Sequence, residues 1–234
     1  MVDYSTFRLK KLDSPEFRHL KYLLYWPVFG LAFFILERLW IRKSYHPVYC
    51  PLDDLIPFCE YFLIPYLFWF LFLLFIHVYT LLFDTASFVK LMKFIMVSYS
   101  LALAVFILFP NCQELRPETF ERDNPFTRFI AGFYRFDTNT NVSPSLHVIG
   151  SVAVAVCAWH SRHFSAAPWR LAFCAAAFLI SVSTVFLKQH SILDILAAIP
   201  VCAVAYVYAY SPPKRALSPQ DGRKKRPPGQ PIKM

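Results

Sequence analysis

Charged residues are scarce in this 234-residue sequence: Asp, Glu, Lys and Arg make up 17% of it, whereas 57% of the residues are hydrophobic. This composition excludes an ordinary soluble domain, in which about a quarter of the residues are charged. The six cysteines lack the paired spacing of a zinc site, and no alternating strand pattern recurs. These absences leave one polytopic membrane domain built from helices.

Long apolar runs are abundant. Six segments approach the roughly 20 residues that a helix needs to cross a bilayer. They run from Tyr22 to Trp40, Tyr61 to Phe83, Phe94 to Pro110, Ser145 to Trp159, Leu171 to Leu187, and Ile195 to Tyr210. We therefore predict an all-α integral membrane protein with six transmembrane helices in one bundle, spanning residues 22–210.

The two ends of the chain flank this predicted bundle. Residues 1–21 are polar, and the apolar run after them has no small-residue cleavage site, so we expect a retained anchor and not a cleaved signal peptide. Residues 211–234 are basic and rich in proline, and we expect them to be disordered.

Basic residues are unevenly divided between the two predicted membrane faces. Six crossings place both termini on one side, and that side carries about two thirds of the 24 Lys and Arg residues. The positive-inside rule then makes both termini cytoplasmic in a multi-pass protein of the cell membrane. The net charge of +9 follows from this asymmetry, so we expect membrane lipids, and no nucleic acid, as partners.

Two histidines and a carboxylate lie at predicted membrane boundaries on the outer face. His190 and Asp194 are four residues apart, which on a helix brings the carboxylate close enough to accept a hydrogen bond from the imidazole. Such a pair orients a histidine and makes it a better base or nucleophile. His147 lies just inside the fourth apolar run. Ionisable groups at such positions are costly and usually functional.

The loop between the third and fourth runs contains an amphipathic segment. Phenylalanines at positions 126, 129, 133 and 136 recur at helical spacing, with Arg128 and Arg135 beside them. This pattern is typical of a helix lying in the membrane interface. Two interpretations stay open: a lid over a lipid-binding mouth, and a membrane-anchored loop without a catalytic role.

The remaining loop residues give weaker signals. Asp53 and Asp54 follow a proline-rich stretch after the first predicted helix, and we interpret them as solvated loop carboxylates. Cys50, Cys59 and Cys112 fall in loops on one predicted side, which leaves a disulfide open.

Three segments together resemble the motifs of the type-2 phosphatidic acid phosphatase superfamily. They are Arg116-Pro117, Pro144-Ser145-Leu146-His147, and Ser183 to Asp194. In that superfamily, the first motif is a run that begins with lysine and ends in arginine-proline. The second motif is Pro-Ser-Gly-His. The third consists of Ser-Arg, five residues, His, three residues and Asp. The order and the spacing of the third motif agree, and the resemblance covers about residues 111–198.

Three positions depart from that pattern. Phe109 stands where the first motif would begin with lysine, Leu146 replaces the glycine of the second motif, and Thr184 replaces the arginine of the third. Two phosphate-binding cations of the family are therefore missing.

The resemblance implies a role for each matching residue. His190 would be the nucleophile that forms a phosphohistidine, oriented by Asp194, and His147 would be the general acid and base. Arg116, Ser145 and Lys188 would bind the phosphate, with Lys188 as a replacement charge. No metal and no cofactor is implied. The implied activity is hydrolysis of a lipid phosphate monoester or diphosphate.

Three other functions stay open. The forms Pro-Ser-Leu-His and Gln-His-Ser-Ile-Leu-Asp are also similar to those of inositol phosphorylceramide and sphingomyelin synthases, which transfer lipid head groups. Two histidines and one carboxylate can hold a metal such as ferrous iron. The missing cations also suit a non-catalytic lipid-binding or transport protein. The sequence makes no prediction of oligomeric state.

Overall fold

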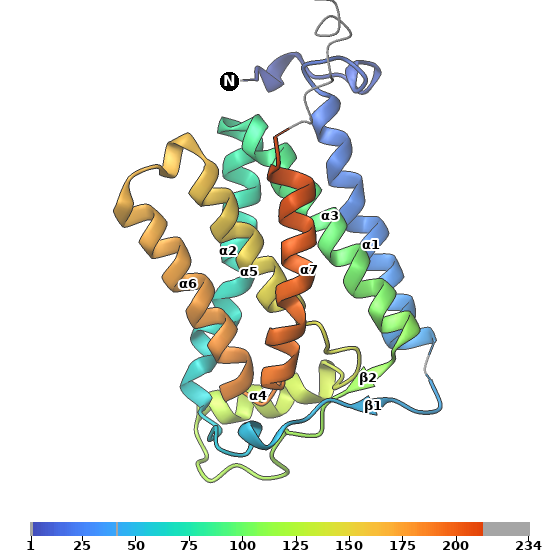
Figure 1. Cartoon of the computed structure of the whole chain (residues 1–234), viewed down its shortest axis with the longest axis vertical. Coiled ribbons are helices and arrows are strands. Elements are labelled where there is room, and N and C mark those ends of the chain that lie inside the picture. The colour runs from blue at the N-terminus through green and yellow to red at the C-terminus, as the bar shows by residue number, and fades with distance from the viewer. Residues whose placement is uncertain (1, 41, 213–234) are drawn as a thin grey trace, which may run out of the picture.

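A computed structural model describes residues 2–40 and 42–212, and its long helices run side by side in one bundle (Figure 1). Within these residues the α-helices are α1 (Tyr25–Phe34), α2 (Leu63–Phe83), α3 (Thr85–Leu108), α4 (Pro125–Phe136), α5 (Leu146–His160), α6 (Ala167–Phe186) and α7 (Ile192–Tyr210). Two short strands, β1 (His46–Pro47) and β2 (Asn111–Cys112), pair in parallel. The predicted tail lies outside the described residues from position 213 onward.

Five helical segments are long and apolar enough to cross a membrane. They are Arg18–Leu39, Glu60–Phe83, Thr85–Leu108, Ala167–Phe186 and Ile192–Tyr210. The first joins a 3-10 helix, α1 and one π-helical turn, Ile35–Leu39. The fourth expected crossing is α5, whose 15 residues extend about 22 Å, less than the hydrocarbon thickness of about 30 Å. The count of six crossings therefore stays a prediction.

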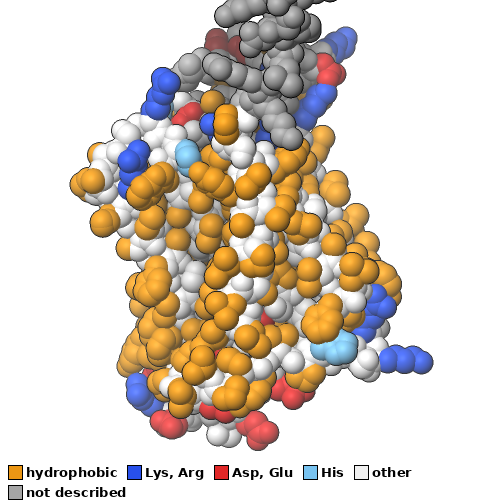
Figure 2. Space-filling view, in the orientation of Figure 1, with side chains coloured by type: hydrophobic (Ala, Val, Ile, Leu, Met, Phe, Trp, Pro, Cys, Tyr) orange, Lys and Arg blue, Asp and Glu red, His pale blue; other side chains and the backbone are white. Residues whose placement is uncertain are grey.

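The surface agrees with a membrane bundle. Figure 2 shows apolar side chains over the middle of the visible face, while Lys, Arg, Asp and Glu gather toward its two ends. A soluble protein rarely exposes so large a continuous apolar area. The predicted membrane bundle is thus confirmed as a mostly helical fold with five helical segments able to span a membrane.

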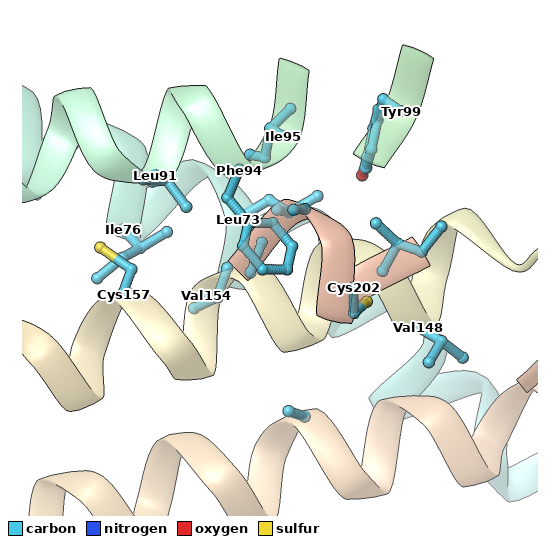
Figure 3. Packing of buried hydrophobic residues seen from close by; sticks show 14 of the residues in the cluster. Leu73, Ile76, Leu91, Phe94, Ile95, Tyr99, Val148, Val154, Cys157 and Cys202 are labelled. Atoms are coloured by element: carbon cyan, nitrogen blue, oxygen red, sulfur yellow. The ribbon is translucent and has the colours of Figure 1, made fainter. Parts of the chain in front are cut away.

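The core lies where α5 packs against α3 and α6. Leu73 and Ile76 of α2, Phe94 of α3 and Val154 of α5 meet there (Figure 3). Small residues of α5, such as Gly150, allow close helix approach, which is how helices associate within lipid. A Cβ atom at Gly150 would lie only 2.7 Å from the Tyr99 hydroxyl.

The predicted interfacial helix is present as α4, which lies across the end of the bundle opposite the N-terminus (Figure 1). Asn124 caps it by accepting hydrogen bonds from two backbone N–H groups. Its phenylalanines are divided between two surroundings. Phe126 and Phe133 pack on the start of α2, whereas Phe129 and Phe136 are 50% and 74% exposed. One set of rings therefore fastens α4 to α2, and the other set is exposed at the surface.

Two loop features bear on the predictions. Asp53 is not a solvated loop carboxylate, because it is only 2% exposed and its side chain accepts hydrogen bonds from the start of α7. The interpretation of Asp54 holds, since this residue is exposed. All three loop cysteines are free, so the disulfide that the sequence left open is not formed.

Candidate active site

The turn between α6 and α7 brings His190 and Asp194 together. Ser191 caps α7: its hydroxyl accepts from the backbone N–H of Leu193 at 3.1 Å, and the Asp194 carboxylate accepts from the Ser191 N–H at 3.0 Å. This reciprocal capping box is favoured by a serine followed three residues later by an acidic residue. The same carboxylate oxygen, Oδ2, lies 3.0 Å from His190 Nδ1. The cap therefore fixes the carboxylate that orients the histidine.

The hydrogen bond assigns the state of the His190 ring. Asp194 is fully buried and His190 is 7% exposed, so a neutral imidazole there carries its proton on Nδ1 and donates it to the carboxylate. The other nitrogen, Nε2, then keeps its lone pair. That arrangement suits a nucleophile or a general base.

His147 faces His190 from the first turn of α5. Its ring lies against two α2 side chains: it stacks on Tyr66, with centroids 4.5 Å apart, and it is tilted against Trp69, with centroids 4.4 Å apart. Its Nε2 is buried without a hydrogen-bond partner. The two histidine rings are 5.7 Å apart at 66°, and both line a cavity of about 80 Å³. The structure thus places two histidines at one small cavity, one bonded to a carboxylate and the other lying against aromatic rings.

Ser145 joins the two histidine-bearing segments. It is fully buried and caps α5, because its hydroxyl accepts from the Val148 N–H. Its own backbone N–H donates to the Asp194 carbonyl at 3.2 Å. Ser145 therefore holds the starts of α5 and α7 together, which sets the separation of the two rings.

Arg116 lies close to the site, but its terminal nitrogens already donate hydrogen bonds to other groups of the protein. It donates to the carbonyls of Tyr134, Asp137 and Thr138 at 2.9–3.1 Å, and to Gln189 Oε1 at 2.6 Å. Burial lowers the pKa of Arg116, and the Asp137 charge partly offsets this. Arg116 thus fastens the end of α4 to the residue beside His190, and it does not line the cavity.

Lys188 points to a different part of the loops. Its Nζ donates to the Asp53 carbonyl at 2.6 Å, and its side chain lines a separate hollow with Asp54 and Glu114. Burial lowers the pKa of the Lys188 amine, and the charges of Asp53 and Asp54 offset part of that effect. Its φ of 52° lies in the left-handed region, which is uncommon for lysine and costs free energy.

Asp53 is a site residue that sequence reasoning missed. Its carboxylate accepts from Ser191 Oγ at 2.6 Å, from the Ile192 N–H at 2.8 Å and from the Cys50 N–H at 2.9 Å. It therefore supports the cap that holds the His190–Asp194 pair. Its contacts with α7 cross 138 residues of sequence, so no local pattern reveals them.

Two acidic residues of the cavity were also missed. Glu37 lies in the π-helical turn after α1, and Asp137 directly follows α4; both line the cavity with the histidines. Glu37 had a signal, since a carboxylate within an apolar run is functional by default. Asp137 gave none.

The three divergent positions carry no positive charge into this cavity. The Phe109 ring stacks on His46 with centroids 4.6 Å apart. The Thr184 hydroxyl donates to the Ser181 carbonyl at 2.7 Å, and Leu146 is a cavity wall. Across residues 2–40 and 42–212, no group of three His, Cys, Asp or Glu side chains is placed to hold a metal ion.

Comparison with known proteins agrees with the motifs. The family model described as PAP2 superfamily matches residues 91–216, which is more than half of the chain and includes both histidines. No curated protein and no solved structure matches the chain. Members of this family act on lipid-like substrates as phosphatases or phosphotransferases and are associated with membranes. The resemblance carried by the three motifs is therefore confirmed: the chain belongs to the PAP2 superfamily.

Proposed function

We propose that the protein cleaves a lipid phosphate ester through a covalent phosphohistidine on His190. The observation that carries this proposal is the 3.0 Å contact between His190 Nδ1 and the buried Asp194 carboxylate. It leaves Nε2 as the nucleophile toward phosphorus. As the Nε2–P bond forms, the ring becomes positively charged, and the adjacent carboxylate stabilises that charge.

His147 is the proposed acid and base. Protonated His147 gives its proton to the lipid alkoxide as the P–O bond breaks. The neutral ring then takes a proton from the incoming hydroxyl, whose oxygen displaces His190 from phosphorus. Positioned proton transfer of this kind contributes about 10²- to 10⁴-fold. The free Nε2 of His147 on the shared cavity supports this role.

Hydrolysis of a lipid phosphate monoester or diphosphate is the first candidate, with water as the incoming group. Head-group transfer to a lipid alcohol is the second. One observation favours the second candidate: the cavity walls include the carboxylates of Glu37 and Asp137, whereas Arg116 and Lys188 donate to other groups. A phosphate monoester with two charges is repelled more strongly there than a diester with one.

The surroundings of the site suit a substrate that resides in a bilayer. We propose a multi-pass protein of the cell membrane with its site on the extracytoplasmic face. His147 lies in the first turn of α5 and His190 lies directly before α7. Both helices begin toward the end of the bundle opposite the N-terminal segment (Figure 1), and the basic excess favours a cytoplasmic position for that segment.

The test uses purified protein in mixed micelles. Phosphatidic acid, an isoprenyl diphosphate and a phosphodiester lipid are each supplied with and without a lipid alcohol, and both free phosphate and new phospholipid are followed. Chelator is added in parallel to test the metal-dependent alternative. Acid-labile phosphate on His190 is sought by mass spectrometry under alkaline conditions.

His190→Ala should abolish turnover and the covalent phosphate. His160→Ala is the matched control, because His160 lies at the far end of α5, where it contacts the Tyr206 hydroxyl at 3.2 Å, and should retain activity. Turnover that survives in His190→Ala would refute the phosphohistidine mechanism. A protein that binds these lipids without converting any of them would be the non-catalytic alternative.

A further inference from the structure

Glu37 places a carboxylate at the cavity beside the histidines. Its Oε1 accepts from Asn141 Nδ2 at 2.6 Å, and its Oε2 accepts from the hydroxyls of Thr138 and Thr140. These donors are all neutral, and no Lys or Arg in the described part of the chain forms an ion pair with Glu37. Its charge is therefore held in place without being neutralised.

The shape of the backbone around Glu37 is also unusual. The residue lies in a single π-helical turn, Ile35–Leu39, at the end of the first crossing. Such turns are rare and occur frequently at functional sites. The turn carries Glu37 to the segment that links α4 to Pro144, so the carboxylate is positioned by two elements far apart in the sequence.

Asp137 adds a second carboxylate to the same cavity. Asp137 forms an ion pair with Arg116, whose Nη2 lies 3.6 Å from Asp137 Oδ2, beyond hydrogen-bond distance. Burial raises the pKa of Asp137 and the charge of Glu37 adds to this effect, whereas the charges of Arg116, His190 and Arg38 lower the pKa. The two carboxylates and His190 thus lie within electrostatic reach of one another.

The other walls of the cavity suit a positive ligand. Phe33 and Tyr66 contribute aromatic rings to it, and aromatic faces attract ammonium groups. Glu37 Oε1 accepts only one hydrogen bond, so it has a free lone pair. His147 Nε2, buried and unpartnered, lines the same space and indicates that a ligand completes the cavity.

We propose that Glu37 and Asp137 form a head-group subsite for a positively charged nitrogen, so that the substrate is a lipid phosphodiester with an amine or quaternary ammonium group. The inference rests on the proposed function, because it places this nitrogen beside the phosphorus that His190 attacks. The positive charge of the substrate then replaces the protein cations that are absent from positions 109 and 184.

The reaction with such a substrate follows directly. His190 Nε2 bonds to phosphorus, the bond from phosphorus to the lipid oxygen breaks, and that oxygen takes a proton from His147. The head group stays on phosphorus, with its nitrogen between the carboxylates and the aromatic rings. A lipid alcohol or water then loses its proton to His147 and displaces His190.

The experiment compares four lipids with identical acyl chains: phosphatidylethanolamine, phosphatidylcholine, phosphatidylglycerol and phosphatidic acid. The wild type should convert the two nitrogen-containing lipids with the higher kcat/KM. Glu37→Gln and Asp137→Asn should each lower the ratio of their kcat/KM to that of phosphatidylglycerol by about tenfold, equivalent to about 1.4 kcal/mol, chiefly through KM. Glu118→Gln, an exposed residue of the same loop region, should leave the ratio unchanged.

A binding measurement separates the subsite from the chemistry. Native mass spectrometry on His190→Ala, which cannot form the covalent intermediate, should show the same ranking of the four lipids, and the ranking should disappear when Glu37→Gln is added. Equal binding of all four lipids would overturn the subsite even if the wild type is active. A ranking that persists while the wild type forms no phosphohistidine would instead refute the proposed function and retain the subsite.

Discussion

Asp53→Asn provides a stringent test of how the site is held together. The Asp53 carboxylate receives three donors: Oδ2 accepts from Ser191 Oγ and the Cys50 N–H, and Oδ1 accepts from the Ile192 N–H. An asparagine presents one oxygen and one NH₂ group. Whichever way the amide is turned, its NH₂ group meets a backbone N–H, so one buried donor loses its acceptor.

The size of the effect follows from these contacts. A hydrogen bond to a charged group contributes about 1.5–3 kcal/mol, and an unsatisfied buried group costs about 1–3 kcal/mol. The carboxylate also lies at the N-terminus of α7, where a negative charge is favourable. Allowing for relaxation of the loop, we expect Asp53→Asn to lower the free energy of unfolding by about 2–4 kcal/mol.

The activity should fall further than stability alone explains. The Ser191 cap that Asp53 supports also donates to the carboxylate that orients His190. Loosening this cap should lower kcat by at least about tenfold, equivalent to about 1.4 kcal/mol in the barrier, with little change in KM. Asp53 is thus a positioning residue, since it acts through the Ser191 cap.

The assay pairs thermal melting in detergent with the rate of phosphohistidine formation well below the melting temperature. Asp54→Asn is the matched control, since this neighbouring carboxylate is exposed and accepts only the Tyr49 hydroxyl. It should melt and react as the wild type does. Indistinguishable melting and kcat for the two variants would refute the proposal that Asp53 supports the Ser191 cap. A loss confined to melting would show that Asp53 stabilises the fold without positioning His190.

Two further predictions concern helix packing and pH. Gly150→Ala should lower both stability and turnover, because a Cβ atom there would lie 3.0 Å from Trp69 Nε1. The Trp69 ring lies against His147, the proposed acid and base, and overpacking typically costs about 1–3 kcal/mol. Gly30→Ala, with nothing within 4 Å of the added atom, should be neutral, and equal effects would contradict the packing argument. Burial acts to raise the pKa of Asp84, but hydrogen bonds from two serines outweigh this effect and lower the pKa. The ionised carboxylate therefore stabilises the fold at pH values above its unfolded pKa, which is near 4. This contribution is lost as the pH falls through the folded pKa. The melting-temperature gap between wild type and Asp84→Asn should therefore be widest at neutral pH and close below about pH 4; a gap that does not change with pH would contradict this.

Local patterns predicted the His190–Asp194 pair well. The four-residue spacing needs only the chain between the two residues, and the structure shows their contact. The Ser191 cap, which the sequence analysis did not predict, is equally local. The shared end of the bundle for His147 and His190 followed from the alternation of crossings, since His147 lies in the first turn of α5 and His190 lies in the turn directly before α7. Both features depend on local spacing and on the positions of apolar runs, and a sequence alone shows both.

Charges at long range were not predictable in this way. The sequence placed Arg116 and Lys188 as phosphate-binding candidates, yet neither lines the cavity and each donates to carbonyls elsewhere. Asp53 was interpreted as solvated because its partners at the start of α7 are 138 and 139 residues away in the sequence. Periodicity likewise predicted α4 but not the division of its phenylalanines, because what a ring contacts depends on elements distant in the sequence.

The divergent position Thr184 shows how the motif keeps its geometry while losing a charge. The Thr184 carbonyl accepts from the backbone N–H groups of Gln189 and His190 at 2.9 and 3.2 Å, so the turn that presents His190 depends on the backbone and not on the side chain at this position. Arginine can therefore be replaced without moving His190, the proposed nucleophile. In the proposed mechanism, the spacing of the motif preserves the reaction, while the charges around it, including Glu37 and Asp137, are free to change the substrate. Measured selectivity should accordingly follow substitutions at these carboxylates, and loss of the covalent step should follow substitutions at the His190 turn and its Asp53 support.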